Sequence, residues 1–260
     1  MLPTKKKIFY FILFSILPFL LLIIRDTSIH FITFFIICLF YPVSRYWKSI
    51  NFLHNGFEII FLYLSISYLL NYLKIDNYFP ANIIIIICFL YLFLFVFKKS
   101  DRKTLFFQLG NRKGTLGIAL LFSIPSIFSL AFWFLNQDTN PYVKFIPDVS
   151  LFLLIPVGIG FAIINAFYEE SLFRSILLSQ FSEQIGIIPA IFLQAIWFSF
   201  LHYQSGFPSG IIGILLTFVF GLMMGYLVKQ TKGLLIPIII HFFADLSIFI
   251  LVILKMKNLI

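Results

Sequence analysis

Long uninterrupted apolar runs dominate this chain, and short polar connections separate them. A helix that crosses a hydrocarbon core about 30 Å thick needs about 20 apolar residues, because it rises about 1.5 Å per residue. The runs predict nine membrane spans, with eight as the alternative count, at 8–24, 29–43, 57–73, 81–97, 115–135, 150–181, 187–202, 209–228 and 233–254. The predicted fold class is an all-α, polytopic transmembrane helix bundle.

Composition supports this prediction. Of the 260 residues, 61% are hydrophobic and 11% are charged, and the mean hydropathy of +1.04 lies outside the usual range of soluble domains. The first apolar run follows Lys5, Lys6 and Lys7 and has no small-x-small cleavage site at its end. We therefore expect a retained first span and no cleaved signal peptide.

The net charge of +9 is a topology signal. Most basic residues fall in alternate connections, which are predicted to lie inside: Lys5, Lys6, Lys7, Arg45, Lys48, Lys98, Lys99, Arg102, Lys103, Arg112, Lys113, Lys229 and Lys232. This bias predicts a cytoplasmic N-terminus in an integral membrane protein. No nucleic-acid-binding module is found, so we expect no nucleic-acid partner and the lipid bilayer as the surroundings.

The polar stretch 98–114 divides the chain. Residues 1–114 are predicted to be a transmembrane scaffold that ends in a basic cytoplasmic loop, and residues 115–260 hold the charged motifs. Within the second part, Gly213, Gly221 and Gly225 recur at helical spacing and would let another helix approach closely. Packing within the chain is the favoured interpretation, and a homodimer through these glycines is the alternative.

Six ionisable residues lie in or against apolar sequence in the second part: Glu169, Glu170, Arg174, His202, His241 and Asp245. Charged side chains at the bilayer centre cost about 2.5–3.5 kcal/mol on insertion scales, so they usually face the bundle interior and mark function. Glu170 and Arg174 are four residues apart, as are His241 and Asp245, and such pairs share one helical face. We expect the six side chains to converge on one cavity.

This combination of residues suits the activation of water for hydrolysis. A buried carboxylate can act as a general base, and imidazoles can bind a metal ion or stabilise a developing oxyanion. Each group of residues also has a purely structural interpretation. Glu170 and Arg174 could form an internal ion pair, His202 could be an interfacial residue, and His241 and Asp245 could form a hydrogen bond between helical turns. A wholly structural origin requires all three at once, so we favour function.

Three motifs resemble those of a known family. Residues 169–174 (EESLFR) resemble the EExxxR motif of the CAAX-protease and bacteriocin-processing (CPBP, Abi) family, whose members include type II CAAX prenyl endopeptidases. Residues 198–202 (FSFLH) resemble its FxxxH motif, and residues 241–245 (HFFAD) its HxxxN/D motif. The resemblance covers about residues 150–254 and implies an all-α bundle with a peptidase site inside the membrane.

The resemblance also implies roles for these residues. Glu169 would activate water with support from Glu170 and Arg174, and His202, His241 and Asp245 would form the oxyanion or metal side. The family has been described both as a metalloprotease and as glutamate-dependent, so a divalent metal such as zinc, held by His202 and His241, is one expectation. The best-known members have Asn where this chain has Asp245.

The predicted function is therefore an intramembrane endopeptidase that acts on a membrane-anchored peptide or protein, in a bacterial cytoplasmic membrane. One alternative is a non-catalytic immunity or scaffold protein that binds a peptide. Another is a proton-coupled transporter, although the polar-poor first half argues against it.

Counting residues from the span ends gives unequal depths in the membrane for Glu169, His202 and His241. We therefore expect either tilted spans or a helix that breaks near Glu169. We also expect the connection 203–208 to close the site from bulk lipid.

Overall fold

The computed structural model describes residues 4–23, 54–75, 79–111, 113–136, 149–205 and 207–257, and this part of the chain is helical and has no strand. The predicted all-α bundle is confirmed. The helices are α1 (Thr4–Ile23), α3 (His54–Tyr72), α4 (Ala81–Leu92), η2 (Phe93–Phe97), α5 (Thr115–Leu135), α6 (Leu151–Glu169), η4 (Glu170–Leu177), α7 (Leu178–Ile185), α8 (Ile187–Ser205), α9 (Gly210–Thr231) and α10 (Leu235–Met256). Both η elements are π-helices. The span predicted at 29–43 lies outside the described residues.

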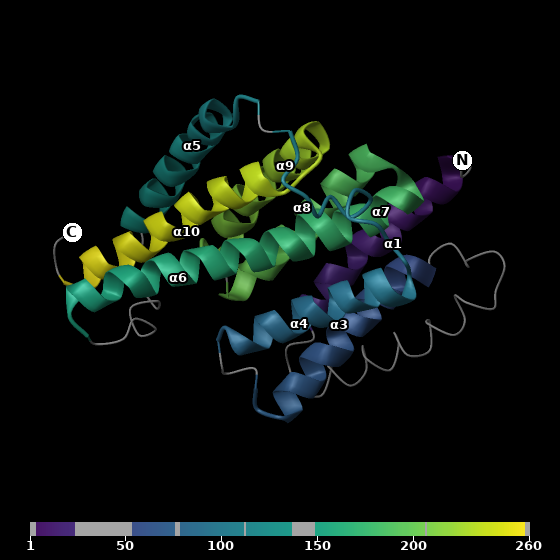
Figure 1. Ribbon diagram of the computed structural model, residues 1–260, viewed down its shortest axis with the longest axis horizontal. Coiled ribbons are helices and arrows are strands. Elements are labelled where there is room, and N and C mark those ends of the chain that lie inside the picture. Colours follow the sequence, from purple (N-terminus) through teal and green to yellow (C-terminus); the bar gives the residue numbers. More distant parts are fainter. Residues whose placement is uncertain are drawn as a thin grey trace.

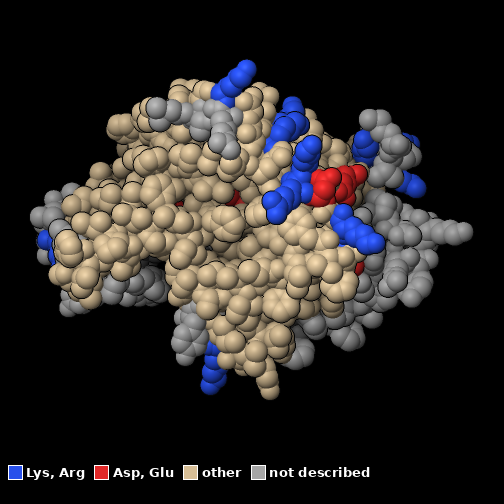
Figure 2. Space-filling model, viewed as in Figure 1, with Lys and Arg blue, Asp and Glu red and all other residues tan. Residues whose placement is uncertain are grey.

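The helices have the length and surface of a membrane protein. Among the described residues, four helices are long and apolar enough to cross a bilayer, namely Gly117–Leu135, Phe152–Ile185, Gly210–Thr231 and Leu235–Met256. Three shorter apolar helices accompany them. The predicted count of eight or nine spans is not confirmed. Large aromatic side chains point outward, among them Phe128, Phe132 and Phe152, which are 71%, 74% and 83% exposed. Figure 2 shows a mainly uncharged surface, as expected for a face in contact with lipid.

Helix packing brings the three motifs together. α6 and α10 lie side by side along much of their length, and α5 packs on α10 (Figure 1). α8 packs against α9, α7 and α1. The side chain of Trp197 on α8 donates a hydrogen bond to the carbonyl oxygen of Phe14 on α1, at 3.1 Å. The motif helices α6, α8 and α10 are thus held by neighbours on several sides.

The first half of the chain contributes to the same hydrophobic core. Buried residues of α1, α3, α4 and η2, such as Phe14, Leu90 and Leu94, share one cluster with Phe181 and Trp197 of the second half. These helices therefore support the motif-bearing helices, in addition to facing lipid. The division of the chain at residue 114 stays a prediction.

The glycines of α9 allow α8 to approach closely. A Cβ atom at Gly221 would lie 3.0 Å from the Cα atom of Ala195, and one at Gly225 would lie 2.8 Å from the Gln194 side chain. Gln194 in turn donates a hydrogen bond to the carbonyl oxygen of Gly221, at 2.7 Å. This face of α9 is therefore occupied by packing within the chain, the interpretation favoured from the sequence. The homodimer alternative stays a prediction.

The polar stretch after η2 docks on the turn between α9 and α10. The backbone N–H of Leu234 donates to the carbonyl oxygen of Gln108 at 2.9 Å, and the Gln108 side chain donates to the carbonyl oxygen of Lys232 at 2.7 Å. Gly110 has a φ of +78°, and a Cβ atom there would lie 2.5 Å from the Thr231 carbonyl oxygen, so this contact needs glycine. The loop thus ties the two halves together near the α10 N-terminus.

Candidate active site

The EESLFR motif lies within a continuous helical run. α6 passes without interruption into η4 and α7. A helix break near Glu169 was one of the two alternatives expected from the sequence, and this alternative is wrong. The motif is instead wound as a π-helix over Glu170–Leu177, and every residue of this segment is buried. π-Helical turns are rare and often occur at functional sites, because the wider turn redirects side chains.

Glu170 forms the centre of a buried polar group. Its Oε1 atom lies 2.7 Å from Nδ1 of His241 on α10, and its Oε2 atom lies 3.4 Å from Nε of Arg174. The side chains of Glu170 and Arg174 are both 0% exposed. A carboxylate can only accept a hydrogen bond, so Nδ1 of His241 is the donor. Glu170 thereby fixes the orientation of the imidazole ring.

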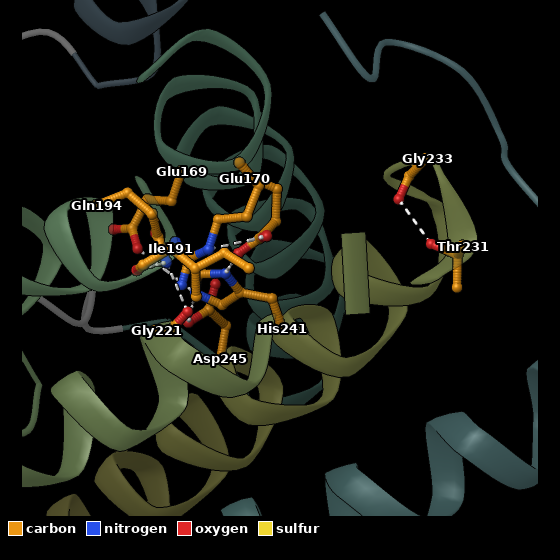
Figure 3. A network of polar contacts seen from close by, with 10 residues as sticks. Glu169, Glu170, Ile191, Gln194, Gly221, Thr231, Gly233, His241 and Asp245 are labelled. Atoms are coloured by element: carbon orange, nitrogen blue, oxygen red, sulfur yellow. Dashed lines mark hydrogen bonds and ion pairs between the residues drawn. The ribbon is translucent and has the colours of Figure 1, made fainter. Parts of the chain in front are cut away.

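Glu169 and Asp245 lie on the other side of the same imidazole. Nε2 of His241 is 3.5 Å from Oε2 of Glu169 and 3.6 Å from Oδ1 of Asp245. Figure 3 shows Glu169, Glu170, His241 and Asp245 directed toward one another from α6, η4 and α10. Three carboxylates therefore surround one histidine, which links the first and third sequence motifs.

Asn165 connects the two carboxylates, a role that the sequence did not reveal. Its Nδ2 atom lies 3.1 Å from Oδ2 of Asp245 and 3.3 Å from Oε1 of Glu169. The sequence does place Asn165 four residues before Glu169, and residues four apart share a helical face, so a contact between these two side chains could have been predicted. The contact with Asp245, 80 residues away, required the packing of α6 on α10.

The second motif contributes His202 and Phe198 from α8. Nδ1 of His202 lies 2.8 Å from the carbonyl oxygen of Phe198, which can only accept, so Nδ1 carries the proton and Nε2 is free of this bond. The Phe198 ring lies 4.4 Å from the His202 ring and 6.2 Å from the His241 ring. The Arg174 guanidinium lies over the Phe198 ring, 4.2 Å from the ring centre. Phe198 therefore contacts residues of all three motifs.

Residues of all three motifs line a cavity of about 740 Å³. Its polar lining includes Asn165, Glu169, His202, His241 and Asp245. The remainder is mainly apolar and comes from α5, α6, α9, α10 and the segment 207–208. It includes Phe122, Leu130, Phe161, Phe207, Pro208, Leu216, Val219, Phe220, Met223, Ile248, Phe249 and Val252. A mainly apolar cavity with a few convergent polar groups is typical of a ligand-binding or active site.

The expected convergence of six ionisable side chains on one cavity is confirmed for four of them, and it is wrong for Glu170 and Arg174. Glu169, His202, His241 and Asp245 line the cavity, whereas Glu170 and Arg174 lie buried behind it. Phe207 and Pro208 lie on the cavity wall, at the end of the connection that we expected to close the site. The catalytic roles of the six residues stay predictions.

The same geometry allows a test of whether the residues fit a metal ion. In both His202 and His241 the Nδ1 atom is hydrogen-bonded to an oxygen and Nε2 is not, which is common in metal-ligating histidines. A structural or catalytic zinc ion needs at least three protein ligands close together. No group of three or more His, Cys, Asp or Glu side chains in the described residues is arranged to hold one. The described residues therefore do not fit a zinc ion as they stand, and the expected metal at His202 and His241 stays a prediction.

Comparison with protein families gives a match over the same region. Residues 151–247 match the family model described as Type II CAAX prenyl endopeptidase Rce1-like, and this segment contains all three motifs. The resemblance inferred from the motifs is therefore confirmed over α6 to the middle of α10. No match was found among curated proteins or among solved structures.

Proposed function

We propose that this protein is an intramembrane endopeptidase that hydrolyses a peptide bond in a membrane-anchored peptide or protein. The observation that carries the proposal is the gathering of Glu169, His202, His241 and Asp245 in the wall of an otherwise mainly apolar cavity. Ionisable groups are costly inside a membrane protein, and here they meet from three helices. The family match over residues 151–247 supports peptide hydrolysis as the chemistry.

Glu169 is the proposed general base. Its side chain is 17% exposed and lines the cavity. We propose that this carboxylate takes a proton from a water molecule in the cavity while the water oxygen attacks the carbonyl carbon of the substrate. Glu170 is sealed from the cavity and already bound to His241, so it is the less suitable base.

His241 and Glu170 are proposed to stabilise the negative charge that develops on the carbonyl oxygen. In its protonated form, His241 donates through Nδ1 to Glu170 and presents the Nε2 proton to the cavity. Fixed donors that meet a developing charge are a major source of catalysis, because they need no reorganisation during the reaction. Arg174 lies next to Glu170 and partly balances its charge.

His202 is the proposed carrier of the proton that leaves with the amine. Its Nδ1 proton is held by the carbonyl oxygen of Phe198, so Nε2 is the nitrogen left to exchange a proton at the cavity wall. Nε2 of His202 takes up the proton that Glu169 removed from the water and passes it to the amine nitrogen as the carbon–nitrogen bond breaks. Glu169 and His202 thereby return to their starting states, and the water oxygen remains on the new carboxylate. General acid and base groups of this kind contribute about 10²- to 10⁴-fold to a rate.

The cavity favours a substrate with an apolar segment beside the scissile bond. Beyond His241 and Asp245, the cavity lining on α10 continues through Ile248 and Phe249 to Val252. On α9 the lining includes Leu216 and Val219. We propose that this part holds the membrane anchor, such as a lipidated cysteine or an apolar stretch of peptide. A bacterial cytoplasmic membrane with the N-terminus inside is the proposed location.

Metal dependence is the alternative mechanism. It would require His202, His241 and a carboxylate to move closer together than they are in this structure, so no step of the proposal passes through a metal ion. Exhaustive chelation distinguishes the two mechanisms, because a glutamate-dependent enzyme keeps its activity. Loss of activity on chelation that zinc restores would show that the metal is required.

The test uses the full-length protein in lipid nanodiscs with two internally quenched probes. One probe ends in a prenylated cysteine followed by three residues, and the other contains an unmodified apolar segment. We expect the wild type to cleave at least one probe and Glu169→Gln to lower kcat by about 10²- to 10⁴-fold. Glu183→Gln is the matched control, because Glu183 is exposed on α7 and does not line the cavity.

Equal loss in both variants would contradict the role of Glu169. Tight binding of a probe by the wild type without cleavage, with binding unchanged in Glu169→Gln, would favour the non-catalytic peptide-binding alternative. A transporter would cleave neither probe and would move protons across the membrane.

A further inference from the structure

We propose that Asn165 is a positioning residue of this site, and that its amide group fixes the distance between the two carboxylates that face the cavity. The inference rests on the proposed function for its effect on catalysis. The pairing of Asn165 with Asp245 can also be tested without any substrate.

Asn165 is placed for this role by helix packing. It lies on α6 one turn before Glu169, and α6 packs against α10, which carries Asp245. Its Nδ2 atom reaches Oδ2 of Asp245 at 3.1 Å and Oε1 of Glu169 at 3.3 Å. The amide nitrogen has two hydrogens, so each carboxylate can receive one. The reverse orientation would place the amide oxygen against two carboxylates, which is unfavourable.

The local charge explains why a neutral donor suits this position. Glu169, Glu170 and Asp245 bring three carboxylates to one imidazole, and Arg174 lies next to Glu170 only. A basic residue in place of Asn165 would bind Glu169 and compete with the water that the base must activate. An apolar residue would leave the two carboxylates free to move apart. The amide donates to both and adds no charge.

Asn165 binds the carboxylate oxygens that lie away from the imidazole of His241. It bonds Oε1 of Glu169 and Oδ2 of Asp245, whereas Oε2 of Glu169 and Oδ1 of Asp245 are the atoms nearest to Nε2 of His241. Asn165 thereby turns the remaining oxygen of each carboxylate toward the imidazole. Its removal should disturb the geometry of the reacting groups while the rest of the cavity stays in place.

The first test is a pair of kinetic constants. Asn165→Leu keeps the size of the side chain and removes both hydrogen bonds, so we expect kcat on a cleaved probe to fall by about 10- to 100-fold, as for other supporting hydrogen bonds at catalytic sites. KM should stay within about threefold, because the apolar part of the cavity is unchanged. The matched control is Asn71→Leu, since Asn71 is an exposed position on α3 and should change neither constant.

The second test exchanges the amide of Asn165 and the carboxylate of Asp245. Asn165→Asp alone places another carboxylate beside Glu169 and Asp245, and we expect it to be at least as inactive as Asn165→Leu. Adding Asp245→Asn restores one amide and one carboxylate across the α6–α10 contact, so the double variant should recover activity relative to Asn165→Asp. A double variant no more active than Asn165→Asp, or a wild-type kcat in Asn165→Leu, would overturn the positioning role.

A third measurement separates this inference from the proposed function. The unfolding midpoint is measured for the wild type, Asn165→Asp, Asp245→Asn and the double variant, with no substrate present. If the two residues are paired, the shift of the double variant is smaller than the sum of the single shifts. Additive shifts would refute the pairing even in an active enzyme. A clear coupling in a protein that cleaves no probe would keep the pairing and refute the peptidase.

Discussion

Glu170→Gln gives the sharpest test of the buried group behind the cavity. Glu170 and Arg174 are both 0% exposed. Within the part of the chain that the structure describes, the guanidinium nitrogens make no hydrogen bond, and the carboxylate in ion-pair contact with them is that of Glu170. Removing one partner of a buried ion pair costs about 3–5 kcal/mol, because the other charge stays buried and unpaired. The contact between Arg174 and Phe198, worth about 0.5–2 kcal/mol, does not offset this cost.

Stability should recover when both partners of the buried ion pair are replaced. Replacing a whole buried pair with groups of similar size is often neutral, so Glu170→Gln combined with Arg174→Met should regain most of the lost stability. It should not regain activity, because the charged partner of His241 Nδ1 is still missing. Stability and activity are thus expected to separate.

Equilibrium unfolding in mixed micelles, followed by tryptophan fluorescence, measures the stability of each variant. Glu58→Gln is the control, since Glu58 pairs with Lys98 where both side chains are partly exposed, and such pairs are worth about 0–1 kcal/mol. A Glu170→Gln protein as stable as the control would refute the reasoning. So would a double variant that is no more stable than Glu170→Gln.

Three further predictions follow from the geometry. Asp245→Asn should lower activity by about 10- to 100-fold if the carboxylate orients His241, and activity equal to or above that of the wild type would show that Asp245 only replaces an amide. Gly221→Val should lower the free energy of unfolding by about 1–3 kcal/mol, because a Cβ atom there meets the backbone of Ala195, whereas Gly117→Ala meets nothing within 4 Å and should not destabilise the protein. Ser171→Cys should resist a bulky, membrane-impermeant thiol reagent, because Ser171 is 0% exposed, while Lys99→Cys on the exposed loop should react. Rapid labelling of Ser171→Cys from both sides of the membrane would show that the motif lies on the surface.

Much of the fold was predictable from the sequence because the bilayer imposes a simple rule on helix length. The runs at 81–97 and 115–135 coincide with α4 plus η2 and with α5, and most other ends differ by only a few residues. Hydropathy does not predict how the helices pack. The contact of α6 with α10 depends on side-chain fit, and so does the burial of Phe14 of α1 against Phe181 of α7.

The candidate site was predictable as a set of residues but not as a geometry. The cost of burying Glu170, Arg174 and His241 in apolar sequence predicted that they meet, and they do. The π-helix at Glu170–Leu177 was not predictable, because helical periodicity in a sequence assumes regular α-turns. Asn165 stands one turn before Glu169 in the sequence, but its contact with Asp245 was not predictable because it depends on the packing of α6 on α10.

The most direct test of the account is cleavage in water enriched in heavy oxygen, with the wild-type protein in nanodiscs and the probe it cleaves. Both fragments are identified by mass spectrometry. If Glu169 activates water for hydrolysis, the new C-terminal carboxylate should contain one heavy oxygen atom, and Glu169→Gln should form neither fragment at a comparable rate. A fragment without heavy oxygen, or labelled cleavage at the wild-type rate in Glu169→Gln, would contradict the account.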